Sequence, residues 1–158
     1  MPRDSPKYIE IYQVYSPRLR ANLHPYINWK FLHRAAGNLA ASFATLHEEG
    51  YVVGDDNQGN ILVDPAQALV TLVDMDSFQV KDPSSGYVFR CPVGMLGYTP
   101  PEMRLVSSFD CVDRAPSHDL FGLGVLVFKL LMEGFHPFMG GPKNPNASCL
   151  MGTQLWSV

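Results

Sequence analysis

Apolar residues recur every three or four positions between Asn28 and Glu49, and this spacing predicts an amphipathic α-helix. Asn28 is a good N-cap, and Gly50 follows the last turn as a residue that can end the helix in the left-handed conformation. The predicted buried face consists of Leu32, Ala35, Ala36, Leu39, Phe43 and Leu46.

A short hairpin is predicted after this helix. Residues 60–63 (NILV) are typical of a strand, residues 64–67 (DPAQ) of a turn, and residues 68–75 (ALVTLVDM) of a second strand. The next segment, 76–101, contains Pro, Gly and Ser and has no hydrophobic period, so we expect a long loop. Loops of that length inside a domain are usually functional or disordered.

A second helix is predicted from about Ser117 to Glu133, followed by Gly134 and then Pro137. It is apolar on nearly every face, which predicts that it lies in the interior. The fold class expected from these elements is α+β, mainly α-helical, with one small β-hairpin. The remaining residues, 139–158, have several helix breakers and predict an irregular tail.

The composition and the net charge of the chain limit the binding partners and the cellular compartment that we expect. The chain has 158 residues, enough for one domain, and a net charge of −3, which favours neither nucleic acid nor an anionic membrane as partner. Its three cysteines have no C-x-x-C spacing, which suits a reducing cytosol. The N-terminus lacks the apolar core of a signal peptide, and residues 120–132 are too few to span a bilayer. We therefore expect a cytoplasmic protein.

The candidate chemistry lies in the polar residues around the hairpin. Taken alone, Asp55 and Asn60 are explained by hydrogen bonds that polar side chains make within a turn. However, the hairpin would bring Asp74 and Asp76 back to the point where the loop of Asp55 begins. Converging carboxylates repel one another unless cations neutralise them, and oxygen ligands without His or Cys favour Mg²⁺ or Mn²⁺. This pattern predicts a metal site that handles phosphate groups.

Five motifs in order resemble the C-terminal lobe of a eukaryotic-type (Ser/Thr) protein kinase-like domain, and we interpret the chain as a divergent bacterial member. The family's H-R-D-x-x-x-x-N is similar to V-G-D-D-N-Q-G-N (53–60), and its D-F-G to D-M-D (74–76). Its A-P-E resembles P-P-E (100–102). Its D-x-W-x-x-G and G-x-x-P-F resemble D-L-F-G-L-G (119–124) and G-F-H-P-F (134–138).

The resemblance implies roles for the polar residues. Asp55 would accept or orient the proton of the attacking hydroxyl, and Asn57 stands at the catalytic position where the family has a Lys that reaches the transferred phosphate. Asn60 and Asp74 would bind the Mg²⁺ (or Mn²⁺) ions that bridge the phosphates of ATP. Asp76 would add a metal ligand or cap the turn.

Other positions would have supporting roles in a kinase-like lobe. Glu102 would anchor the activation segment, which would correspond to the 76–101 loop, and Asp119 would brace the backbone of the catalytic loop. Gly54 replaces the Arg that pairs with an activation-loop phosphate in many kinases, so regulation of that kind is not expected.

The expected domain is residues 1–138, the large-lobe part of a kinase-like domain, because no Gly-rich loop and no V-A-I-K lysine precede residue 28. The expected function is transfer of phosphate from ATP to a Ser/Thr hydroxyl of a protein substrate. The chain alone would be weakly active or inactive without its nucleotide lobe. Two alternatives stay open: a pseudokinase scaffold, and a small-molecule kinase of the aminoglycoside-phosphotransferase type.

Overall fold

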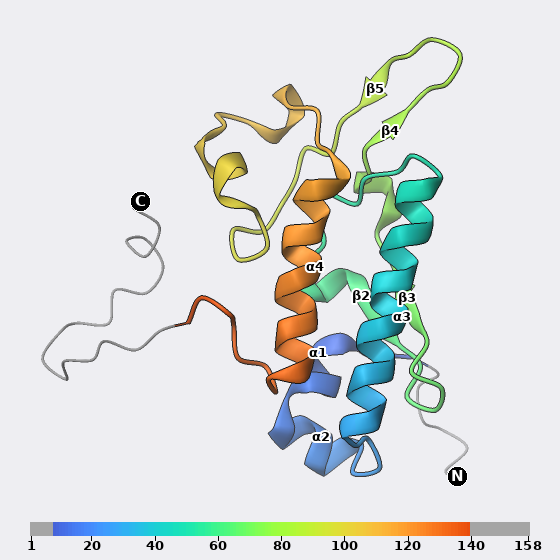
Figure 1. Cartoon of the computed structure of the whole chain (residues 1–158), viewed down its shortest axis with the longest axis vertical. Helices are drawn as coiled ribbons and strands as arrows, with labels where there is room; N and C mark the ends of the chain where they lie inside the picture. The colour runs from blue at the N-terminus through green and yellow to red at the C-terminus, as the bar shows by residue number, and fades with distance from the viewer. Residues whose placement is uncertain (1–7, 140–158) are drawn as a thin grey trace, which may run out of the picture.

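Two long helices that run in opposite directions form the centre of the fold (Figure 1). The computed structural model describes residues 8–139. Helix α3 spans Trp29–Glu48, and the Asn28 side chain caps it by accepting a hydrogen bond from the Phe31 N–H at 3.1 Å. Gly50 follows it with φ 84°. The predicted helix and both of its ends are confirmed, and five of the six residues predicted for its apolar face are buried.

Helix α4 spans Pro116–Leu131 and packs against α3. Gly134 lies just after it with φ 89°. The prediction that α4 is buried on all sides is wrong, because Leu120 is 54% exposed and Phe128 is 36% exposed. Its buried residues include Leu123, Val125, Leu126 and Leu130, and the helix packs against α3 and α1 (Ile11–Tyr15). It also contacts residues 53–60, which we call the catalytic-loop segment after the kinase motif that they resemble.

A three-stranded antiparallel sheet lies beside the helix pair. Strand β2 (Ile61–Val63) is in the middle, between β1 (Ile9–Glu10) and β3 (Val70–Leu72). The predicted hairpin is therefore present, with Leu62 opposite Thr71. Its second strand is shorter than predicted because Asp74 adopts a left-handed conformation, φ 61°, which ends the extended backbone.

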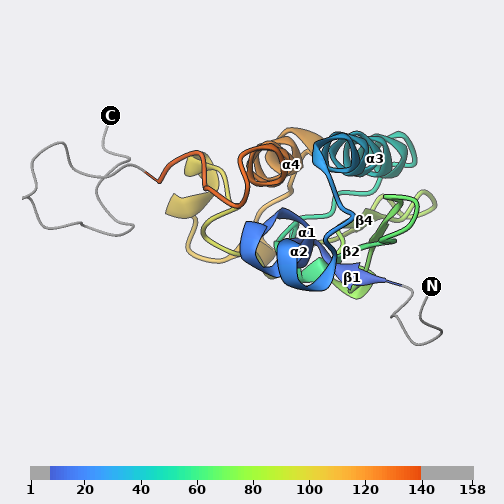
Figure 2. The ribbon, with the colours of Figure 1, turned by 90° about the horizontal axis from the view of Figure 1, so that it is seen from below.

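Two short helices follow β1, and Ser16 separates them. Helix α1 spans Ile11–Tyr15, and helix α2 spans Pro17–Leu23, with proline in its first turn. Figure 2 shows α3 and α4 side by side in one layer, with α1, α2 and the sheet against one face of this layer. The apolar core fills the space between these layers.

The segment expected to be an irregular loop, 76–101, contains a second hairpin. Strands β4 (Val80–Lys81) and β5 (Val88–Phe89) pair in antiparallel register, and Figure 1 shows that this hairpin projects from the body of the fold. Asp82 closes the turn by accepting hydrogen bonds from the Ser84 and Ser85 side chains. Sequence periodicity missed the hairpin because two-residue strands are too short to show alternation.

Four 3₁₀ turns complete the described chain: η1 (Gln58–Asn60), η2 (Met75–Ser77), η3 (Pro101–Leu105) and η4 (Phe109–Cys111). The predicted irregular tail, 139–158, lies outside the described residues except for its first residue. Within residues 8–139, none of the helices has the length and hydropathy that a membrane span requires.

Candidate functional site

The catalytic-loop segment folds so that Asn60 binds Asp55. The Asn60 amide Nδ2 donates to the Asp55 carbonyl oxygen at 2.9 Å and to the Asp55 Oδ2 at 3.0 Å. Turn η1 brings the two residues together, and Asn57 caps this turn by accepting a hydrogen bond from the Gly59 N–H at 2.8 Å. Asn57 is 9% exposed. Its amide oxygen is thus used within the loop.

Asp74 lies next to this pair. The N–H of Val73 donates to the Asn60 carbonyl at 2.9 Å, so the end of β3 is tied to the end of the catalytic-loop segment. A hydrogen bond with Asp76 raises the pKa of Asp74, and the charges of Asp76 and then Asp55 raise it further. Asn60 is thus bonded to Asp55, and Asp74 lies close enough to Asp76 and Asp55 for their charges to act on it. The joint role of these residues in one site stays a prediction.

The metal site expected at Asn60, Asp74 and Asp76 stays a prediction. Both hydrogen bonds from the Asn60 side chain use its nitrogen, so its amide oxygen remains available as a ligand. Asp74 and Asp76 are exposed carboxylates whose mutual repulsion a cation would relieve. No group of three or more His, Cys, Asp or Glu residues suited to a metal occurs within residues 8–139. Mg²⁺ needs only one or two carboxylates, because water and phosphate complete its shell.

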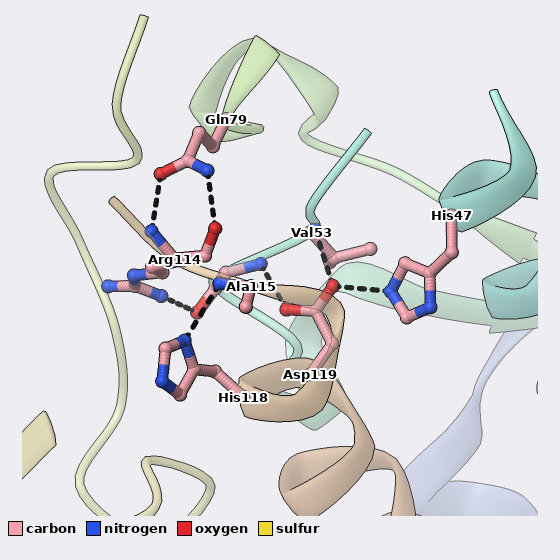
Figure 3. A network of polar contacts seen from close by, with 8 residues as sticks. His47, Val53, Gln79, Arg114, Ala115, His118 and Asp119 are labelled. Carbon is pink, nitrogen blue, oxygen red and sulfur yellow. Dashed lines mark hydrogen bonds and ion pairs between the residues drawn. The ribbon is translucent and has the colours of Figure 1, made fainter. Parts of the chain in front are cut away.

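Asp119 braces the same loop from α4, as the resemblance implied (Figure 3). Its two carboxylate oxygens accept hydrogen bonds from the backbone N–H groups of Val53, at 2.8 Å, and Gly54, at 2.9 Å. His47, near the end of α3, places its Nε2 2.8 Å from Asp119 Oδ2. Asp119 is 1% exposed, so these contacts satisfy a fully buried carboxylate.

Gly54 is required by the backbone at its position. Its backbone φ angle is 72°, a value that residues other than glycine rarely adopt. A Cβ atom there would lie 2.7 Å from the Cys91 sulfur. The replacement of the family's Arg by glycine therefore has a local structural reason, and it lets the buried Cys91 pack against the loop.

Arg114 connects the catalytic-loop segment to the segment that precedes P-P-E. Its guanidinium donates to the carbonyl oxygens of Gly54 and Val93 and lies 4.6 Å from the centre of the Phe109 ring. The Gln79 side-chain amide holds the Arg114 backbone through two hydrogen bonds of 2.7 and 2.8 Å (Figure 3). The same view shows His118 accepting a hydrogen bond from the Ala115 N–H at the start of α4.

Asp56 follows the proposed base, and the sequence did not reveal that it is buried. It is 4% exposed and lies against Gly122 of α4. Burial raises its pKa well above the usual value, and the nearby Asp119 carboxylate raises it further. Within a run as polar as D-D-N-Q-G-N, nothing in the pattern distinguishes a buried aspartate from an exposed one.

A second unpredicted cluster surrounds Lys129 of α4. Its ammonium donates to Gln58 Oε1 at 2.6 Å and to the Tyr98 hydroxyl at 2.8 Å, and it lies 5.0 Å from the centre of the Tyr15 ring. Both phenols also donate to Gln58. Burial lowers the pKa of Lys129 and raises the pKa of Tyr15 to about 12. The cluster joins α1, α4, the catalytic-loop segment and the segment before P-P-E.

The P-P-E segment forms turn η3. Its buried residue is Met103, which is 4% exposed, whereas Glu102 is exposed. The anchoring role proposed for Glu102 stays a prediction.

Proteins similar in sequence to this chain are named as kinases. No model of a known protein family matches the chain. Two proteins named protein kinase YegI, from Escherichia coli O157:H7 and E. coli K12, are 41% identical over 155 residues. The match covers 98% of this chain and only 23% of those proteins. A probable serine/threonine-protein kinase, irlC of Dictyostelium discoideum, is 29% identical over 93 residues, 59% of this chain and 6% of that protein.

These matches confirm the resemblance drawn from the five motifs. Over nearly all of its length the chain is similar to bacterial proteins named as protein kinases, and over 59% of its length it is similar to a probable serine/threonine-protein kinase.

Proposed function

We propose that the chain carries the base and the metal ligands of a phosphotransferase that moves phosphate from ATP to a Ser/Thr hydroxyl of a protein. The observation that carries this proposal is the double hydrogen bond from Asn60 to Asp55, with Asp74 beside them. The Asn60 side chain would thereby orient the proposed base and leave its own amide oxygen available to a metal ion. The kinase names of the relatives support the same class of reaction.

Each residue would have a distinct task. The Asp55 carboxylate would accept the proton of the attacking hydroxyl, with Asn60 fixing its orientation. Asn60, Asp74 and Asp76 would hold Mg²⁺ or Mn²⁺, which supplies charge stabilisation at the phosphates when bound. Asn57 would act through the shape of the loop, since its amide oxygen caps η1.

A pseudokinase scaffold is the second candidate. It is favoured by Asn57, because a neutral and buried side chain stands where the family has a Lys that contacts the transferred phosphate. A scaffold of this kind would keep ATP or protein binding without turnover. It would need the braced loop but not the proton acceptor.

The two candidate functions predict different effects on phosphate transfer when Asp55 or Asp74 is replaced. The test uses the 158-residue chain, and the same chain with its natural flanking sequence, supplied with Mg²⁺ and labelled ATP. We expect Asp55→Ala to lower phosphate transfer by about 10²–10⁴-fold, the usual contribution of a general base, while Mn²⁺ binding is kept. Asp74→Asn should lose both transfer and Mn²⁺ binding.

Asp113→Asn is the matched control, because Asp113 is an exposed carboxylate that pairs with Arg90 outside the site. It should change neither quantity. Nucleotide binding without transfer in the wild type would support the scaffold. Absence of ATP and Mn²⁺ binding at millimolar concentration in both forms would reject the phosphotransferase. Transfer to a small-molecule acceptor instead of protein would keep the site chemistry and replace the substrate class.

A further inference from the structure

Two buried polar atoms within residues 8–139 have no hydrogen-bond partner in the protein, and they belong to residues that line the same cavity. The atoms are Asp56 Oδ2 and Arg114 Nε. Asp56 is 4% exposed and Arg114 is 7% exposed. Their cavity has a volume of about 10 Å³. Its wall also includes Gly54, Thr99 and Asp119.

Both residues are held in place by contacts with other parts of the protein. Arg114 is fixed by its hydrogen bonds to the carbonyls of Gly54 and Val93 and by the Phe109 ring. Asp56 is fixed by α4, because its carboxyl group fills the space that a side chain at Gly122 would occupy. One acceptor and one donor thus belong to two fixed residues that line the same small cavity. Leaving either atom unpaired would be unfavourable, because a buried polar group that has lost its contact with water needs another partner.

We propose that this cavity is the binding site of a single buried water molecule, which hydrogen-bonds to both Asp56 Oδ2 and Arg114 Nε. The volume is about that of one water-sized probe, and a buried water needs two to four polar partners. Thr99 offers a third partner, because its hydroxyl donates to the Met95 carbonyl and keeps its oxygen lone pairs available. The carboxyl group of Asp56 can serve as a partner whether it is neutral or ionised.

The proposed water would join three segments that are far apart in the sequence. Asp56 belongs to the catalytic-loop segment, Thr99 to the segment that leads into P-P-E, and Arg114 to the residues just before α4. Asp55 directly precedes Asp56, so the water would fix the backbone that carries the proposed base. The water site itself does not depend on phosphotransfer and can be tested without any activity.

The primary test is a crystal structure of the wild-type chain at a resolution where ordered water is visible. We expect one peak of electron density within hydrogen-bond distance of both Asp56 Oδ2 and Arg114 Nε. In solution, nuclear Overhauser effects should connect a long-lived water with the amide protons of Asp56 and Thr99. Direct contact between the carboxyl group and the guanidinium would overturn the proposal. So would a cavity without density, or a peak with the coordination of a metal ion.

Two variants sharpen the result. Asp56→Asn keeps an acceptor oxygen in the same place, so the density peak and the Overhauser effects should remain. Asp56→Leu removes both oxygens and fills the cavity with carbon, so both signals should be lost. If water persisted in Asp56→Leu, Asp56 would not be its ligand and the proposal would fail. If Asp56→Leu does not fold, the wild type and Asp56→Asn still decide between a bound water and none.

Discussion

Replacing Gly122 with alanine should destabilise the protein although it improves helix propensity. A Cβ at this position would lie 1.8 Å from Asp56 Oδ2, 2.4 Å from its Cγ and 2.6 Å from its Oδ1. All three atoms belong to one buried carboxyl group. The adjoining cavity, about 10 Å³, cannot accept that group. The Gly122→Ala variant can therefore form only if the catalytic-loop segment or α4 shifts.

The size of the effect follows from two opposing contributions. Overpacking a buried site costs about 1–3 kcal/mol, and Gly→Ala in a helix interior gains about 1 kcal/mol. Because three contacts fall on one fixed group, the cost should be at the upper end, which leaves a net loss of about 2 kcal/mol. Gly124 lies two residues further along α4, is exposed and has nothing within 4 Å of its Cβ position. Gly124→Ala should therefore stabilise by up to about 1 kcal/mol.

Urea unfolding of both variants measures this difference directly. The free energies of unfolding of Gly122→Ala and Gly124→Ala should differ by about 3 kcal/mol, since the helix contribution is shared and the clash is not. Adding Asp56→Ala to Gly122→Ala should recover part of the loss, because the clashing group is gone. Equal stability of the two single variants would refute the close packing of Asp56 against α4.

Three further changes test the network around the site. Asp119→Ala should lower the free energy of unfolding by about 3–6 kcal/mol in urea titrations, because the N–H groups of Val53 and Gly54 each lose a charged acceptor. The control Asp113→Ala removes one side of an exposed ion pair and should lower it by only about 0–1 kcal/mol. Burial raises the pKa of Asp56 in the folded protein, so the protonated carboxyl group is the form that stabilises the fold. Its full contribution to the free energy of unfolding is present below about pH 4, the pKa of Asp in the unfolded chain, and is lost as the pH rises toward the pKa in the folded protein. Asp56→Asn should therefore gain stability relative to wild type as pH increases above about 4 in parallel titrations, and a constant difference would contradict the shift. Tyr98→Phe should cost about 1 kcal/mol in thermal unfolding through its lost bonds to Gln58 and Lys129, and the exposed Tyr87→Phe should cost nothing measurable.

The sequence predicted the elements whose signals are local. Asn28 and Gly50 mark the ends of α3, and the spacing of apolar residues between them follows the helical period. The β2–β3 hairpin also follows from local pattern, because the D-P-A-Q turn separates two apolar runs. Since the hairpin closes beside its own starting point, the order of residues along the chain is enough to predict that Asn60 and Asp74 meet.

Other features depend on contacts between distant segments and left no signal in the sequence. The buried position of Asp56 depends on Gly122, 66 residues further along the chain, and a glycine within a helical pattern does not show what it packs against. The cluster of Lys129, Gln58 and Tyr98 is likewise formed by tertiary packing. An apolar stretch with one lysine predicted a buried helix, and only the fold shows which face meets solvent.

The brace from Asp119 to the catalytic-loop segment also couples the stability of the loop to that of the core. The hydrogen bonds from Val53 and Gly54 cross 66 and 65 residues of sequence, and their acceptor belongs to α4, which packs against α3. The backbone that leads into Asp55 therefore keeps these bonds only while the two helices stay docked. Exchange of the Val53 and Gly54 amide protons with deuterium should then proceed through global unfolding, at rates close to those of the slowest amides in α3.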